Sequence, residues 1–169
     1  MGHHAHSAFD DAKVGCAVVT VSDTRTPADD RSGSEIRRAL TQAGHHVASS
    51  AVVPDEPTAI RAEVERAATS EGVTAVVITG GTGIAPRDVT IESLAGLWSK
   101  ELPGFGEIFR TLSYAELGPA AFLSRATAGV IRGKFVVVLP GSPAACRLAM
   151  ESLVIPELGH VAALLGASS

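Results

Sequence analysis

The sequence predicts an α/β protein with three layers, α/β/α, in which helices cover both faces of a mostly parallel sheet. Two observations lead to this class. Apolar runs such as residues 15–21 are rich in β-branched side chains and lack polar alternation, which is typical of strands buried on both faces. Segments with apolar residues at helical spacing follow these runs, and strands that alternate with helices favour a parallel sheet.

The elements follow one another in a regular order. After the first strand, residues 34–43 carry an apolar helical stripe, with Ser32 or Ser34 available as the N-cap and Gly44 as the stop. By the same criteria we expect strands at 47–53, 73–79, 126–131 and 134–139, and helices at 58–68, 90–97, 107–116 and 144–165. Pro156 should kink or divide the last helix, because its ring removes a hydrogen bond and clashes with the preceding turn.

Length and composition exclude some classes of protein and of partner. The chain has 169 residues, 46% of them hydrophobic, which suits one domain with a buried core and excludes a disordered chain. Its 14 Lys and Arg are scattered and are outnumbered by 18 Asp and Glu, so we expect no nucleic-acid partner. Cys16 and Cys146 lie in apolar stretches and are interpreted as buried thiols of a reducing compartment.

The N-terminal residues and the length of the apolar runs suggest a cytoplasmic protein. Residues 1–12 read as a flexible tail without the basic and apolar regions of a secretion signal, and residues 13–166 as a single domain. No uncharged apolar run reaches the roughly 18 residues of a membrane helix. We therefore expect neither export nor a membrane partner.

A glycine-rich segment follows the predicted strand at 73–79. Thr79, Gly80, Gly81, Thr82 and Gly83 can point consecutive backbone N–H groups and two hydroxyls into one concavity, which suits a phosphate. A glycine-rich turn that only redirects the chain is the alternative. The segment is not a Walker A loop, since no Gly-Lys-Ser/Thr follows, and it lacks the third glycine of a dinucleotide fingerprint.

Two carboxylates are expected beside this segment. Asp88 follows the glycines, and Asp55 follows the strand at 47–53, so both lie at the edge where parallel strands end. Mg²⁺ is coordinated by oxygen atoms, usually from one or two carboxylates together with substrate phosphates. We therefore expect Asp55 and Asp88 to hold Mg²⁺. The structural alternatives are a helix cap for Asp88 and an Asx-type turn for Asp55.

Two further strand ends add small polar residues to the same edge. Ser22 and Asp23 follow the first strand, and Pro140, Gly141 and Ser142 follow the last. Any one of these junctions is explained as turn chemistry. Together they predict one extended site for a polyanionic ligand.

Two more segments are candidates for the site. The one that contains Gly104 and Glu107 either begins a helix or lines a pocket. The other offers the hydroxyl of Ser124 beside the guanidinium of Arg125, which can hold a phosphate through two hydrogen bonds.

Five motifs occur in a fixed order: TGGTG at 79–83, PRDVT at 86–90, PGFGE at 103–107, LSRA at 123–126 and PGSP at 140–143. With them the chain resembles the MoaB/Mog family of molybdenum cofactor biosynthesis proteins over about residues 13–165. TVSD at 20–23, GHHV at 44–47 and GEIFR at 106–110 make it most similar to the MoaB branch.

The resemblance implies a molybdopterin-binding-protein-like fold and, in active members, a Mg²⁺-dependent adenylyltransferase that joins ATP to molybdopterin and releases pyrophosphate. By motif position it places the essential acidic residues on Asp55 and Asp88 and the pterin-phosphate contact on Ser124. It also implies a homotrimer or homohexamer, and a molybdenum insertase of the same pathway as a partner.

A carrier protein and a signalling receiver domain are the alternatives to catalysis. Some MoaB-type members lack the acidic pair, whereas this chain keeps both Asp55 and Asp88, which favours catalysis. The alternative is a carrier or scaffold that binds molybdopterin without turning over ATP. A signalling receiver domain would need a phosphoacceptor Asp with an acidic pair and a Lys, and the five motifs argue against it.

Overall fold

Six strands form one mixed sheet in the order β2-β1-β3-β6-β5-β4. The structure is a computed structural model that describes residues 12–166; residues 1–11, most of the predicted tail, lie outside the described residues. The strands are β1 (Gly15–Val21), β2 (His46–Val53), β3 (Ala75–Thr79), β4 (Lys100–Glu101), β5 (Thr127–Ile131) and β6 (Lys134–Leu139). The first four in spatial order pair in parallel, while β5 and β4 pair antiparallel to their neighbours, so the sheet is mostly parallel as predicted.

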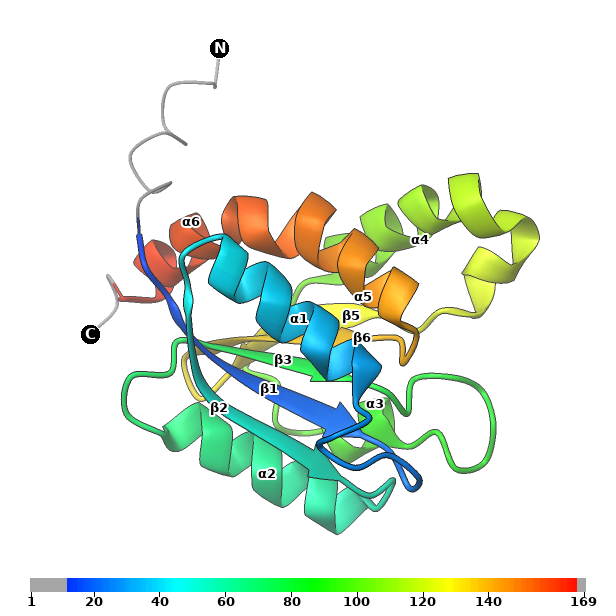
Figure 1. Cartoon of the computed structure of the whole chain (residues 1–169), viewed down its shortest axis with the longest axis horizontal. Helices are drawn as coiled ribbons and strands as arrows, with labels where there is room; N and C mark the ends of the chain where they lie inside the picture. The colour runs from blue at the N-terminus through cyan, green and yellow to red at the C-terminus, as the bar shows by residue number, and fades with distance from the viewer. Residues whose placement is uncertain (1–11, 167–169) are drawn as a thin grey trace.

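Helices cover both faces of the sheet, which confirms the three-layer arrangement. The helices are α1 (Arg31–Gln42), α2 (Pro57–Thr69), α3 (Thr90–Ser93), α4 (Pro103–Leu117), the 3₁₀ helix η2 (Gly118–Leu123), α5 (Pro143–Ala149), the π turn η3 (Met150–Val154) and α6 (Ile155–Gly166). In Figure 1, α1, α4, α5 and α6 lie on one side of the sheet, and α2 and α3 lie on the other.

Each face of the sheet has its own apolar core. Ala75 and Val77 of β3 face the cluster beneath α1, α5 and α6, whereas Val76 and Ile78 face the cluster above α2. Successive side chains of a strand point to opposite faces, so a strand covered on both sides must be apolar throughout. This explains why the runs lack polar alternation.

The first helix begins earlier than predicted and uses a different cap. Asp30, and not Ser32 or Ser34, is the N-cap, and its carboxylate accepts a hydrogen bond from the N–H of Gly33. The predicted stop is confirmed, since Gly44 adopts a φ of 83° just after the helix.

The segment predicted as a helix at 90–97 is helical only over α3, Thr90–Ser93. The hydroxyl of Ser93 donates to the carbonyl of Val89 at 2.6 Å, and Gly96 turns the chain with a φ of 78°. The chain then forms β4, a two-residue strand that was not predicted and that pairs with β5.

The last helix runs without a break over 143–166, and the disturbance expected at Pro156 takes the form of the π turn η3 just before it. A π turn changes the hydrogen-bond register, which accommodates a residue that has no N–H to donate. By length and composition this helix is apolar enough to cross a membrane, and 28% of its 18-residue apolar window is buried in the protein. The side chains of Cys146, Met150 and Leu158 on it are fully buried in the core beneath it.

Candidate functional site

The carboxyl ends of the parallel strands meet along one rim of the sheet. In Figure 1 the loops after β1, β3 and β6 gather on the right-hand side, where the strand arrows end. Gly80 has a φ of 99°, and a Cβ there would lie 2.2 Å from the carbonyl oxygen of Val21. A Cβ on Gly141 would lie 3.4 Å from the Cα of Gly80. Glycine therefore allows the loops after three strands to pack closely together.

The glycine loop presents free backbone donors. Within residues 12–166, the N–H groups of Gly81, Thr82 and Gly83 donate to no acceptor, whereas the N–H of Gly80 donates to the carbonyl of Leu139. Consecutive unpaired amides in such a loop form an anion-binding concavity. The phosphate cradle at these residues stays a prediction, which the free amides support.

Thr79 contributes differently from the sequence expectation. Its side chain is buried, and its hydroxyl donates to the carbonyl of Pro140 at 2.8 Å and lies 3.2 Å from the Sγ of Cys146. The Thr79 hydroxyl therefore ties the end of β3 to the loop after β6 and does not face the rim as a phosphate donor.

Three loops, those after β1, β2 and β3, bring acidic side chains together at the glycines. Asp55 donates its backbone N–H to a carboxylate oxygen of Asp23 at 3.0 Å. Arg87 binds the other oxygen of Asp23 at 2.5 Å and reaches Glu56 at 3.2 Å. The carboxylate of Asp88 accepts from the N–H of Ala85 at 2.9 Å. The structure thus brings the predicted residues Asp23, Asp55 and Asp88 together.

The two aspartates nearest one another have opposite pKa shifts. The hydrogen bond from Arg87 and the N–H of Asp55 lower the pKa of Asp23. Burial, followed by the negative charges of Asp23 and Asp88, raises the pKa of Asp55. The fold therefore holds the Asp55 carboxylate where its charge is disfavoured, as is common at functional sites.

Neither Asp55 nor Asp88 is the N-cap of the helix that follows it. Val89 is the N-cap of α3 and Glu56 that of α2, and neither helix has a side-chain cap. The bond from Ala85 shows that Asp88 also shapes its own loop.

Among the described residues, no group of three or more His, Cys, Asp or Glu gathers as a metal site. Two carboxylates beside free amides suit Mg²⁺ only when substrate phosphates supply further oxygen ligands.

Arg125 is engaged with the glycine loop. Its guanidinium donates to the carbonyls of Thr82 and Asp88, each at 3.1 Å, and forms an ion pair with Glu92. The hydrogen bond from Arg125 lowers the pKa of Glu92. In this structure Arg125 therefore braces the loop that carries Asp88, and a phosphate would have to compete with Glu92 for it.

The three predicted serines each accept a backbone hydrogen bond. Ser22 accepts from Arg25 at 3.2 Å, and Ser142 accepts from Ala145 at 3.1 Å as the cap of α5. Ser124 accepts from Ala126 at 3.4 Å. Each hydroxyl keeps its proton for donation to a ligand.

Ser124 lines two cavities. A cavity of about 140 Å³ between α4 and α5 is lined by Ser124, Pro140 and Ser142, with apolar walls. A wider one of about 600 Å³ is lined by Glu107, Ser124 and Arg125, together with Trp98. Gly104 at the start of α4 lines neither of them. The segment 124–125 therefore joins the glycine loop to both hollows.

Comparison with known proteins identifies the family of this chain. Residues 17–160 match the family described as a probable molybdopterin binding domain. The chain is 55% identical over 149 residues to molybdenum cofactor biosynthesis protein B of Bacillus subtilis, with 88% of each chain covered. It belongs to the MoaB/Mog family of molybdenum cofactor biosynthesis proteins.

Solved structures of MoaB/Mog proteins share the fold. A crystal structure of molybdenum cofactor biosynthesis protein B superimposes with a TM-score of 0.90 at 46% identity, covering 92% of this chain and 98% of the other. The tungsten cofactor synthesizing protein MoaB from Pyrococcus furiosus gives 0.81 at 40% identity, with 90% and 97% covered. The resemblance inferred from the motifs is thereby confirmed, and this MoaB/Mog protein has a role in molybdenum cofactor biosynthesis.

The sequence patterns did not predict several residues of this MoaB/Mog site. Arg87 and Glu56 tie the acidic loops together, and Glu92 holds Arg125. Their partners lie 31 and 33 positions away in the chain, so no local spacing reveals the pairs. The one available signal was the position of Arg87 next to Asp88.

Proposed function

We propose that the chain is a molybdopterin adenylyltransferase. A terminal phosphate oxygen of molybdopterin attacks the α-phosphorus of ATP, the bond from that phosphorus to the oxygen bridging it to the β-phosphorus breaks, and pyrophosphate leaves. The observation that carries the proposal is the row of free amides at Gly81, Thr82 and Gly83 beside Asp55 and Asp88.

Such a reaction requires positioning and charge stabilisation and no covalent nucleophile from the protein. The amides of Gly81, Thr82 and Gly83 hold phosphate oxygens, because these amides lose no internal partner when a phosphate binds. Asp55 and Asp88 hold Mg²⁺, which when bound supplies positive charge to the phosphates. Arg87 keeps Asp23 ionised and screens the acidic loops from one another.

The pterin substrate is proposed to lie along the segment that carries Ser124. Its hydroxyl donates to the terminal phosphate of molybdopterin, and the two cavities that this residue lines offer space for the ring system. Glu107 lines the wider cavity and supplies a carboxylate to pterin N–H groups.

The decisive experiment mixes wild-type protein with ATP, Mg²⁺ and molybdopterin and measures pyrophosphate and adenylylated molybdopterin. We expect both products in equal amounts. Binding of molybdopterin without either product would overturn the proposal and favour a carrier or scaffold of the same pathway.

We further propose a cytoplasmic homotrimer or homohexamer that passes its product to a molybdenum insertase. Support for assembly comes from α4 and η2, where Tyr114, Leu117 and Phe122 are 61%, 62% and 74% exposed. Light scattering at micromolar concentration should give three or six times the chain mass, and a monomer would contradict the assembly.

A further inference from the structure

The hydrogen bonds around Arg25 connect two loops of the rim that are distant in sequence. Arg25 Nη1 donates to the hydroxyl of Ser32 at 2.8 Å, and Nη2 donates to the carbonyl of Gly141 at 3.3 Å. The hydroxyl of Ser32 donates to the same carbonyl at 2.7 Å. The carbonyl of Gly141, in the loop after β6, is therefore held by two donors, Arg25 from the loop after β1 and Ser32 from α1.

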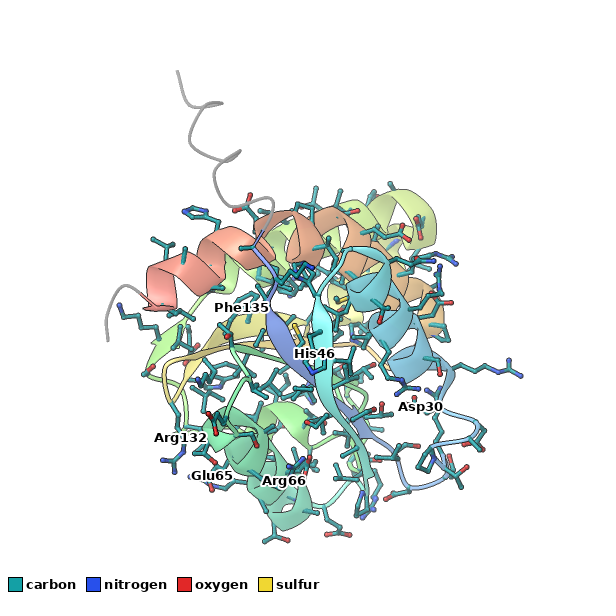
Figure 2. The ribbon with its side chains drawn as sticks, turned by 60° about the vertical axis from the view of Figure 1, so that its left-hand side comes forward. Asp30, His46, Glu65, Arg66, Arg132 and Phe135 are labelled. Carbon is teal, nitrogen blue, oxygen red and sulfur yellow. The ribbon has the colours of Figure 1, made fainter. Side chains whose placement is uncertain are left out.

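A buried carboxylate anchors this arrangement. Asp30, whose side chain is fully buried, accepts from the hydroxyl of Thr20 at 2.8 Å and from the N–H of Gly33 at 2.9 Å. It lies 4.0 Å from Arg25 and 3.4 Å from Arg37. Figure 2 shows Asp30 at the start of α1, next to the loop that follows β1. Because β1 and α1 both fix Asp30, its charge gives Arg25 a defined place.

The position of Gly141 matters to the glycine loop beside it. A Cβ on Gly141 would lie 3.4 Å from the Cα of Gly80, so the two loops already touch, and the next residue along, Ser142, lines the cavity that it shares with Ser124. In a planar trans peptide the N–H of Ser142 points opposite to the carbonyl of Gly141. Fixing that carbonyl therefore fixes the Ser142 amide.

We infer that Arg25 is a positioning residue: by holding the Gly141 carbonyl together with Ser32, it sets the Gly141–Ser142 peptide against the glycine loop at the substrate site. The inference rests on the proposed function for its kinetic consequence only. The chain offers a matched control in Arg37, which also pairs with Asp30 but bonds to Ser50 and Ser34 and does not reach Gly141.

The test compares Arg25→Gln, Arg25→Lys and Arg37→Gln in the full chain. Hydrogen–deuterium exchange over residues 139–146, where the N–H groups of Ala145 and Cys146 donate to Ser142, should rise at least about 5-fold in Arg25→Gln and stay at the wild-type level in Arg37→Gln. In the pyrophosphate assay, Arg25→Gln should lower kcat/KM at least about 10-fold, Arg25→Lys should recover part of it, and Arg37→Gln should keep the wild-type value.

Three results would overturn the inference: unchanged exchange in Arg25→Gln, unchanged kcat/KM despite faster exchange, or an equal loss in Arg37→Gln, which would indicate a general effect on Asp30. Failure of the proposed function looks different, because wild-type protein would then release no pyrophosphate. In that case the role of Arg25 is decided by exchange over 139–146 together with the Kd for molybdopterin in the same three variants. A wild-type Kd in Arg25→Gln would overturn it.

Discussion

Asp88 combines a charge with a structural contact, and two substitutions separate these roles. Asp88→Asn keeps an acceptor for the N–H of Ala85 and removes the negative charge, whereas Asp88→Ala removes both. If the charge positions the phosphates and Mg²⁺, both variants should fold, bind molybdopterin and lose at least about 10²-fold in pyrophosphate release. A wild-type rate in Asp88→Asn with a slow Asp88→Ala would reduce Asp88 to a loop-shaping residue.

Asp55 is expected to lower stability in exchange for function. Its charge is disfavoured by burial and by the neighbouring carboxylates, so Asp55→Asn should raise Tm by about 1–2 °C while lowering pyrophosphate release at least about 10²-fold. Thermal unfolding and the pyrophosphate assay on the same preparation measure both. A clear fall in Tm would show instead that the carboxylate supports the fold.

The same residue predicts the sign of a pH effect. The pKa of Asp55 in the folded protein lies above its ordinary value of 3.8, so the unfolded chain loses this proton first as pH rises. The contribution of Asp55 to stability is therefore complete below pH 3.8 and is lost as pH rises through the folded pKa. Urea unfolding at a series of pH values should show Asp55→Asn gaining on the wild type from acid to neutral pH, and a constant difference would contradict this.

At the scale of elements, the turn between β5 and β6 depends on backbone conformation. Arg132 and Gly133 have φ values of 50° and 74°, and Figure 2 shows Arg132 toward Glu65, with which it pairs at 3.0 Å. Two residues at positive φ match the twist of a two-residue hairpin. Gly133→Ala should therefore lower the free energy of unfolding by about 1 kcal/mol, as urea denaturation would measure.

Gly166 is the matched control for this turn. A Cβ at either glycine meets no atom within 4 Å, but Gly166 ends α6 without a positive φ. Gly166→Ala should leave stability unchanged or slightly higher. Equal losses in the two variants would mean that conformation at the turn is not the cause.

The first helix shows which part of an element is readable from sequence. Its apolar stripe and the Gly44 stop are local features, and both were predicted correctly. The cap was assigned to Ser32 or Ser34, because polar residues crowd this start and each is a reasonable cap. Asp30 takes the role because Thr20, ten positions earlier on β1, donates to its carboxylate, and that contact exists only in the folded protein.

At the scale of the whole molecule, the rule that parallel strands end at one edge predicted which loops meet. It placed Asp55, Asp88 and Gly141 on a common rim without any knowledge of their contacts. It did not predict that Arg125 binds Glu92, or that Arg25 reaches Gly141 across 116 positions. Such pairs depend on side-chain geometry after the layers have packed, and periodicity carries no information about it.

The two cysteines report on the packing of the sheet against the helical layer of α1, α5 and α6. Cys16 on β1 and Cys146 on α5 are free, fully buried, and have pKa values raised to about 12 and about 11, in both cases mainly by burial. A thiol reacts as its thiolate, so a disulfide reagent at pH 8 should modify neither in the native protein and both in urea. Peptide mass spectrometry would follow each site. Because both side chains belong to the core beneath α1, α5 and α6, they should be labelled together at the rate of global unfolding, and rapid labelling of Cys146 alone would show that α5 opens independently of the sheet.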